Sequence, residues 1–194
     1  MRARGACVLF VMALLACLAG PARAGEALSD LKTVVDEVLH VLSSTKQGDP
    51  SRTAKLNEAV GKVFDPEELA KRTLAANWQS FSPDERARFT KAFVSLLERT
   101  YLRRIEAYTD EKVVFLEESK LGDDRSEVST KIVTSSKEIP IVYRLIKKPG
   151  WKVYDVVIEG VSLVQNYRKQ FNEILARETP AQLIGRVESM AAAG

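Results

Sequence analysis

The stretch Trp151-Lys-Val-Tyr-Asp-Val-Val-Ile-Glu-Gly-Val-Ser-Leu-Val-Gln-Asn-Tyr-Arg-Lys-Gln-Phe171 changes from the two-residue period of a strand to the period of a helix across one glycine. Its first part, 151–158, is rich in β-branched and aromatic residues and follows a Lys-Pro-Gly turn, which predicts a strand leaving a hairpin. Gly160 frees the backbone to turn. Ser162 and Gln165 have the spacing of a capping box, so the remainder predicts an amphipathic helix.

Helix starts are clearly marked upstream and downstream of this stretch. Three segments place a capping residue before a proline at the first helical position, with Glu or Gln at the third. Their capping residues are Asp65, Ser82 and Thr179. Apolar stripes also predict a first helix over about 28–47, a shorter one over 50–61, and a long helix from Pro83 to Tyr108.

From Lys112 onward the apolar residues alternate with polar ones. This period of two predicts four strands, over 113–117, 127–134, 139–146 and 151–158. The links between them are short and rich in turn residues, which favours antiparallel neighbours. Helices, then a strand meander, then helices predict an α+β fold.

The first 24 residues have the pattern of a secretory signal peptide. Two arginines precede an apolar run, and Ala22-Arg-Ala24 supplies the small residues of a cleavage site. This predicts export, with residues 25–194 released as one soluble domain. The alternative is a lipoprotein cleavage box at Leu14-Leu-Ala-Cys17, which would leave Cys17 as an acylated N-terminus.

Composition narrows the possible functions. Both cysteines lie within residues 1–24, so cleavage would leave no disulfide and no thiolate chemistry. Three of the 29 Lys and Arg residues and none of the 26 Asp and Glu residues lie there too, so that residues 25–194 carry 26 charges of each sign. A formally neutral chain has no global field to attract nucleic acid, which argues against that partner.

Motifs for catalysis, metal binding and phosphate binding are missing from the sequence. The single histidine, His40, lies among apolar residues, and the sequence has no H-E-x-x-H, no paired cysteines and no glycine-rich phosphate loop. Asp155 and Glu159 are the acidic residues of the opening stretch, and we expect hydrogen bonding for the first and turn formation for the second. We therefore predict a protein that is not an enzyme and has no cofactor, while Asp155 and Tyr154 would be the first suspects in a catalytic alternative.

The third and fourth predicted strands carry apolar side chains on both faces. Ile139, Ile141, Tyr143 and Leu145 alternate with Val142 and Ile146, and the strand over 151–158 behaves in the same way. Helices covering both faces of the sheet would explain this pattern by ordinary packing. A lining for an apolar ligand is the other explanation.

Several separated motifs resemble the MlaC family of periplasmic phospholipid-binding proteins, also called toluene-tolerance auxiliary proteins. These are the opening stretch, the region of Trp78, the F-x-x-x-F-x-x-L-L-x-x-T-Y run from Phe89 to Tyr101, and Ile139-Pro-Ile-Val-Tyr-Arg144. The resemblance covers roughly Leu28 to Val187. It implies a four-stranded antiparallel curved sheet cupped by helices, like nuclear-transport-factor-2-like folds, with an apolar cavity for acyl chains.

The resemblance also implies a function and partners. The chain would carry phospholipid, as cargo and not cofactor, between an inner-membrane ATP-driven (ABC) transporter with a lipid-binding subunit and an outer-membrane lipoprotein complex that maintains outer-membrane lipid asymmetry. Another apolar ligand, such as a hopanoid, fits the same cavity. The predicted lining is Phe93, Leu97, Tyr101, Ile105, Val142, Val157, Val161, Val164, Tyr167 and Phe171. Basic residues expected near its mouth are Arg103, Arg104, Arg144, Lys147, Lys148 and Arg168, for which solvated surface charge is the alternative.

Overall fold

The computed structural model describes residues 25–106 and 112–193, apart from the side chains of residues 103 and 104. In chain order the elements are α1 (Glu26–Ser44), α2 (Pro50–Gly61), α3 (Pro66–Leu74), the 3₁₀ helix η1 (Ala75–Ser80), α4 (Pro83–Leu97), the π-helix η2 (Glu98–Leu102), α5 (Arg103–Glu106), β1 (Lys112–Lys120), β2 (Arg125–Val133), β3 (Glu138–Lys147), β4 (Trp151–Ile158), β5 (Val161–Ser162), α6 (Leu163–Leu175) and α7 (Pro180–Ala192). The predicted α+β class is confirmed.

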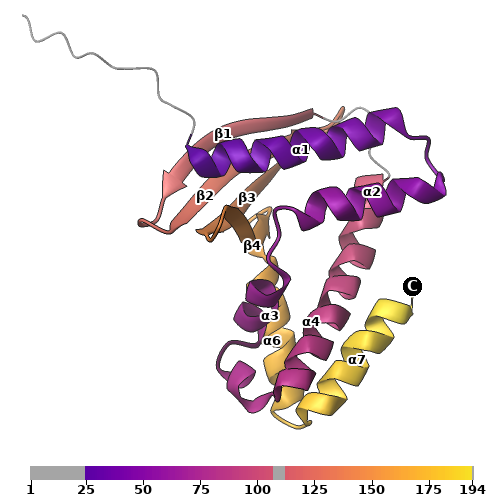
Figure 1. Cartoon of the computed structure of the whole chain (residues 1–194), viewed down its shortest axis with the longest axis vertical. Helices are drawn as coiled ribbons and strands as arrows, with labels where there is room; N and C mark the ends of the chain where they lie inside the picture. The colour runs from indigo at the N-terminus through magenta and orange to yellow at the C-terminus, as the bar shows by residue number, and fades with distance from the viewer. Residues whose placement is uncertain (1–24, 107–111, 194) are drawn as a thin grey trace, which may run out of the picture.

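The strands form one curved antiparallel meander in the order β1-β2-β3-β4-β5 (Figure 1). The prediction of four strands was short by one, because β5 is a two-residue strand that pairs with the end of β4. Glu159 and Gly160 form the intervening turn, with φ of 49° and 82°. This left-handed backbone reverses the chain directly before α6, as the glycine suggested.

Local hydrogen bonds fix the helix starts. Ser82 and Thr179 each form a complete capping box, and the Asp65 side chain accepts a hydrogen bond from the backbone N–H of Glu68. At α6 the hydroxyl of Ser162 accepts from the N–H of Gln165 at 3.0 Å. That hydroxyl also donates to Asp155, so this cap depends on a residue of β4.

The predicted long helix is not continuous. A π-helical turn, η2, separates α4 from the short α5, and the predicted end at Tyr108 lies outside the described residues. Single π-helical turns inside α-helices are rare and are often found at functional sites. Residues on either side of this turn pack into different parts of the molecule.

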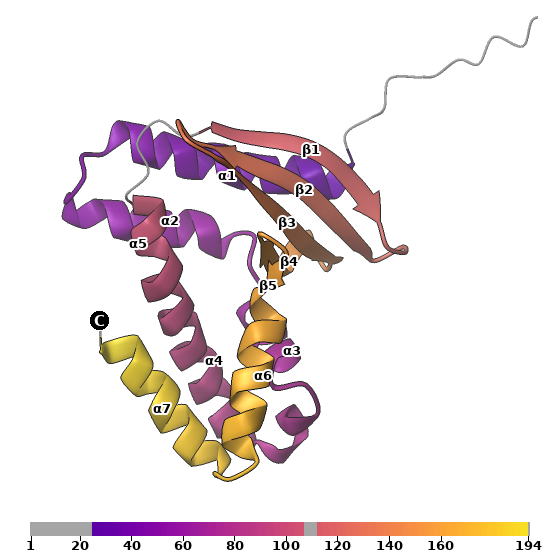
Figure 2. The same ribbon diagram turned by 180° about the vertical axis from the view of Figure 1, so that it is seen from behind.

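Helices are arranged in two groups around the sheet (Figures 1 and 2). Helix α1 lies across one face of the strands, whereas α3, α4, α6 and α7 form a bundle that extends from the end of the sheet near β4. The segment before α3 joins the two groups, since the N–H of Val153 donates to the carbonyl of Val63 at 2.7 Å and the N–H of Asp65 donates to the carbonyl of Val153 at 3.2 Å.

The buried apolar residues form three clusters. The bundle cluster lies among α3, α4, α6 and α7, and includes Phe89, Phe93 and Phe171. The sheet cluster lies between α1 and the sheet, and includes Leu31 and Leu145. The third cluster is small, and we call it the hairpin cluster because α1 and α2, which form a helical hairpin, contribute to it. It consists of Val41, Leu56 and Leu102, with partly buried Val38, Leu42 and Ile105 against it. A domain usually has one contiguous core with small satellite clusters. Here the bundle and the sheet have separate large cores, which makes the region between them the place to look for a binding site.

Candidate functional site

The candidate site is the region where these three clusters approach one another, which we call the cluster junction. The apolar stripe of α1 runs from Leu31 and Val35 in the sheet cluster to Val38 and Val41 in the hairpin cluster. Phe64 packs against both the bundle cluster and the sheet cluster. Phe64 thus belongs to no single core, and α1 connects two of the cores along one helix.

Partly buried apolar side chains concentrate on the α1 side of this junction. Those packed against the sheet cluster include Val34, Val35, Phe115, Ile132, Ile139, Tyr143, Ile158 and Leu163. They come from α1, from the four long strands and from the start of α6. Apolar side chains that retain accessible surface while facing a helix are what a wall for an apolar ligand needs.

Tyr143 illustrates the character of this surface. It lies on the same face of β3 as the buried Ile141 and Leu145, and it keeps part of its own surface accessible. Burial raises the pKa of the Tyr143 phenol to about 12, since the surrounding protein disfavours the charged phenolate. The residue therefore combines accessible surface with an environment that is poor in water.

The π-helical turn carries the chain past the junction. Leu97, before the turn, packs against the bundle cluster, whereas Leu102, at its end, is buried in the hairpin cluster. Glu98 begins the turn, and burial raises the pKa of its carboxyl group. The turn thus connects two cores within a few residues.

Five of the predicted lining residues meet in the bundle cluster. Phe93, Val164, Tyr167 and Phe171 are buried there, and Leu97 packs against them. The Phe93 ring lies 5.2 Å from that of Tyr167 and 5.7 Å from that of Phe171, centroid to centroid. Such spacing is that of packed aromatic side chains.

The other five predicted residues lie apart from this group. Tyr101 and Ile105 are partly buried, and Ile105 packs against the hairpin cluster. Val142 and Val157 are neighbours across β3 and β4, on the face of the sheet opposite Tyr143. Val161 is 56% exposed on β5. A role for the ten residues in binding stays a prediction.

Sequence reasoning missed the α1 side of the sheet as the candidate wall. The alternation of Ile139, Ile141, Tyr143 and Leu145 was visible, but so was that of Val142 and Ile146. In the structure the opposite face carries a charged ladder, in which the Arg144 guanidinium contacts Glu127 at 2.7 Å and Asp155 at 3.2 Å. The sequence did hold one signal: Arg144 alternates with the apolar residues of β3, and its charge indicates that its own face of the sheet is the more polar one.

The Asp155 carboxylate is used in hydrogen bonds that hold the start of α6. Its side chain is 3% exposed, accepts from the Ser162 hydroxyl at 2.6 Å and accepts from the N–H of Val164 at 3.1 Å. The carboxylate thereby caps α6, whose helix dipole it complements. Hydrogen bonding, as expected from the sequence, accounts for this residue.

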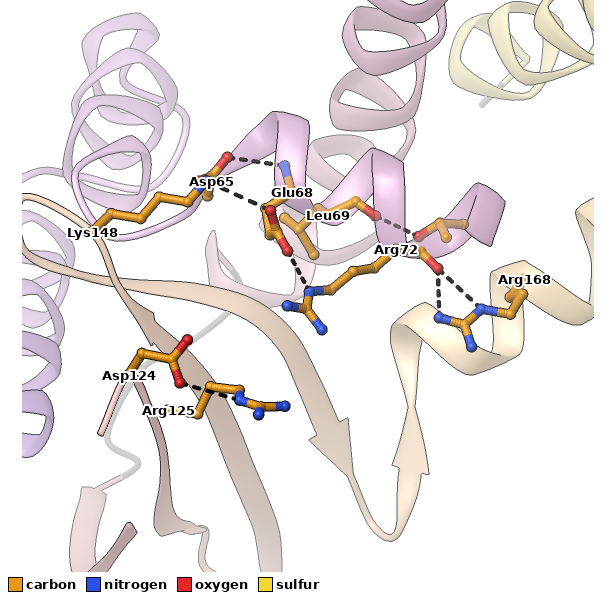
Figure 3. Close-up of polar contacts among 9 residues, drawn as sticks. Asp65, Glu68, Leu69, Arg72, Asp124, Arg125, Lys148 and Arg168 are labelled. Atoms are coloured by element: carbon orange, nitrogen blue, oxygen red, sulfur yellow. Dashed lines mark hydrogen bonds and ion pairs between the residues drawn. The ribbon is translucent and has the colours of Figure 1, made fainter. Parts of the chain in front are cut away.

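Several of the basic residues expected at the cavity mouth contact the protein itself (Figure 3). Lys148 pairs with Asp65, and the Arg168 Nε donates to the carbonyl of Arg72 at 3.0 Å. Burial alone would raise the pKa of Asp65, but hydrogen bonds from Lys148 and the Glu68 N–H lower it overall. Lys147 likewise pairs with Glu26, at 2.7 Å. The side chains of residues 103 and 104 lie outside the described part.

The hollows on the described surface include an open groove and a smaller pocket. An open groove of about 700 Å³ lies between α6 and α7, and includes Ile174, Glu178 and Met190 in its lining. A hollow of about 250 Å³ lies at the start of α2 beside Arg52. Neither lies between the sheet and the bundle, so an apolar cavity there stays a prediction.

The structure also bears on membrane and metal binding. Within residues 25–106 and 112–193, no helix has the length and apolar character needed to cross a bilayer. The same residues contain no group of His, Cys, Asp and Glu side chains arranged to hold a metal ion.

Comparison with known proteins gives consistent matches. A family model described as MlaC protein matches residues 32–189. The intermembrane phospholipid transport system binding protein MlaC of Haemophilus influenzae is 30% identical over 157 residues, which cover 77% of this chain and 72% of that protein. The toluene tolerance protein ttg2D of Pseudomonas putida is 25% identical over 126 residues, 63% of this chain and 58% of that protein.

A solved structure is similar over nearly its whole length. It is that of a phospholipid-binding protein from Ralstonia solanacearum in complex with a phospholipid. The TM-score is 0.75 at 26% identity, and the match covers 87% of this chain and 98% of the other.

Proposed function

The chain belongs to the MlaC family, and on that premise we propose that it is a periplasmic carrier that holds phospholipid by its acyl chains and moves it between membranes unchanged. The observation that carries the proposal is the match to a fold that holds a phospholipid in a solved structure. The absence of catalytic motifs in the sequence agrees with a binding role. No cofactor is required, since the lipid is the cargo.

The cluster junction is the proposed place for the acyl chains. Side chains of α1 and the sheet would form one wall, and Leu97, Tyr101 and Ile105 would line the helical side. Because the buried members of the three clusters are separate, opening at the junction would leave each of these cores together and would disturb chiefly Phe64, which packs against two of them. The aromatic group around Phe93 would form the base of the opened space.

The energetics suit an apolar wall without charged anchors. Burying one CH₂ contributes about 0.8 kcal/mol, so a 16-carbon chain would recover on the order of 10 kcal/mol of the cost of leaving a bilayer. Lys148 and Arg168 are already engaged within the protein, and therefore the headgroup would remain in water. We expect weak headgroup specificity for this reason.

The energetics call for partners, and the family suggests which they are. Release of the chains into water would be uphill, so loading and unloading need membrane complexes that accept the lipid directly. We propose an inner-membrane ABC transporter with a lipid-binding subunit at one end and an outer-membrane lipoprotein complex at the other. Export by the N-terminal signal peptide would bring the chain to the compartment between them.

Vesicle uptake tests the carrier function. Delipidated protein is incubated with vesicles of one phospholipid at a time, separated from them, and analysed for bound lipid. We expect comparable uptake of phosphatidylethanolamine and phosphatidylglycerol. Uptake of neither would count against the proposal, and preferential uptake of a hopanoid from mixed vesicles would favour a different apolar cargo.

A further inference from the structure

The start of α1 is capped by a residue from the edge strand. Gly25 has no side chain to cap the helix. Instead, the Glu118 carboxylate of β1 accepts from the N–H of Leu28 at 2.8 Å through Oε2 and from the Ser126 hydroxyl at 3.0 Å through Oε1. Since Ser126 is fully buried, both oxygens are held in place.

Gly25 lies in close contact with this carboxylate. A Cβ atom built on Gly25 would be 2.1 Å from Oε2 and 2.3 Å from Oε1 of Glu118. The φ angle of Gly25 is an ordinary −64°, so a larger residue here would be limited not by the backbone but by the Glu118 carboxylate, which it would have to displace. Because N and Cβ of one residue lie about 2.5 Å apart, the nitrogen of Gly25 is within about 4.6 Å of Oε2.

The sequence places a processing signal directly before this contact. Ala22-Arg-Ala24 has the small residues that a signal peptidase reads, and cleavage after Ala24 would make Gly25 the first residue. We propose that cleavage of the Ala24–Gly25 bond sets the new α-ammonium group of Gly25 against the Glu118 carboxylate, so that processing itself completes the cap of α1 and ties this helix to β1.

Cleavage is a hydrolysis of the Ala24–Gly25 amide bond. Residues 1–24 are released with a C-terminal carboxylate at Ala24, and Gly25 gains a protonated amine. An ammonium group at a helix N-terminus is disfavoured by the helix dipole. Glu118 offsets this effect, because its carboxylate interacts favourably with both the ammonium group and the helix N-terminus.

Acylation at Cys17 would have a different result. Residues 17–24 would then stay attached, and the nitrogen of Gly25 would remain an uncharged amide that cannot form an ion pair. The two routes of maturation therefore differ in whether Gly25 can pair with Glu118, whatever the cargo is.

The first measurement is the intact mass of the protein recovered from cells that express the full chain. We expect the mass of residues 25–194. The second compares purified chains that begin at Gly25 with chains that begin at Ala24, each with and without Glu118→Gln. We expect the unfolding equilibrium constant to be roughly two- to fivefold smaller for the Gly25 start when Glu118 is present. With Glu118→Gln this advantage should disappear or reverse, because the ammonium group of Gly25 then meets the helix dipole without a carboxylate to offset it.

Glu117→Gln is the matched control, since it removes a neighbouring exposed charge. The difference between the two starts should persist in this variant. A mature chain that begins at another residue would overturn the proposal. A difference between starts that Glu118→Gln leaves unchanged would overturn it equally, because the ammonium group would then not interact with Glu118.

Discussion

Tyr167 stands edge-on to Phe93, with the ring centroids 5.2 Å apart and the ring planes at 81°. Phe93 comes from α4 and Tyr167 from α6, so this pair joins two helices of the bundle. Phe171 lies against both rings. The contact makes the bundle a firm base beneath the cluster junction.

Truncation of this base should cost stability. Because Phe93 is 1% exposed, Phe93→Ala should lower the free energy of unfolding by about 3–5 kcal/mol. Val161→Ala is the control: its side chain is 56% exposed, and the change should stay within about 0.5 kcal/mol. Urea unfolding followed by circular dichroism measures both, and a Phe93→Ala effect as small as that of the control would contradict the packing described.

The Asp155 cap should link the sheet to α6 energetically. Asp155→Asn removes a buried charge that Arg144, Ser162 and the Val164 N–H all contact, and should cost about 1–3 kcal/mol because the amide cannot accept from all of these donors. Ser162→Ala should cost about 1–2 kcal/mol, as for other lost helix caps. A double-mutant cycle checks the link, and strictly additive effects would argue against it.

Acid should weaken the contact between the β3–β4 hairpin and α3. The pKa of Asp65 is lowered in the folded protein, so the stability it contributes is present above its unfolded-state pKa and is lost as pH falls through the lower folded-state pKa. Asp65→Asn should therefore be less stable than the natural chain at pH 7, with a gap that narrows below about pH 4. Unfolding curves from pH 2 to 7 test this, and a constant gap would refute it.

Alkaline titration should detect a late ionisation of Tyr143. Its pKa is raised to about 12, so it should stay neutral in the folded protein when an unfolded tyrosine ionises. Stability that is present below the ordinary value of 10.0 is therefore lost as pH rises from there to about 12. Absorbance at the phenolate band follows the ionisation, and Tyr143→Phe should remove the late step.

Local structure followed from sequence where neighbouring residues decide it. The helix starts at Asp65, Ser82 and Thr179 were predicted because a cap needs only a few residues and their own backbone. The strand-to-helix change around Gly160 was predicted for the same reason. The α+β class then followed from the order of the elements.

Features that depend on distant contacts were not predicted. The π-helical turn at Glu98 interrupts a stripe that is otherwise regular, and β5 is too short to give a pattern. The face that α1 covers could not be chosen, since both faces of β3 and β4 carry apolar residues. The raised pKa of Tyr143 depends on the side chains that bury it, which come from distant parts of the sequence.

The amount of phospholipid bound to protein purified from cells, measured by native mass spectrometry, tests the central claim most directly. We predict a phospholipid adduct on the natural chain, little on Ile139→Trp, which fills the α1 side of the sheet, and a normal amount on Ile146→Trp, which alters the opposite face. A natural chain without lipid, or an adduct lost in Ile146→Trp and kept in Ile139→Trp, would contradict a cargo held at the cluster junction.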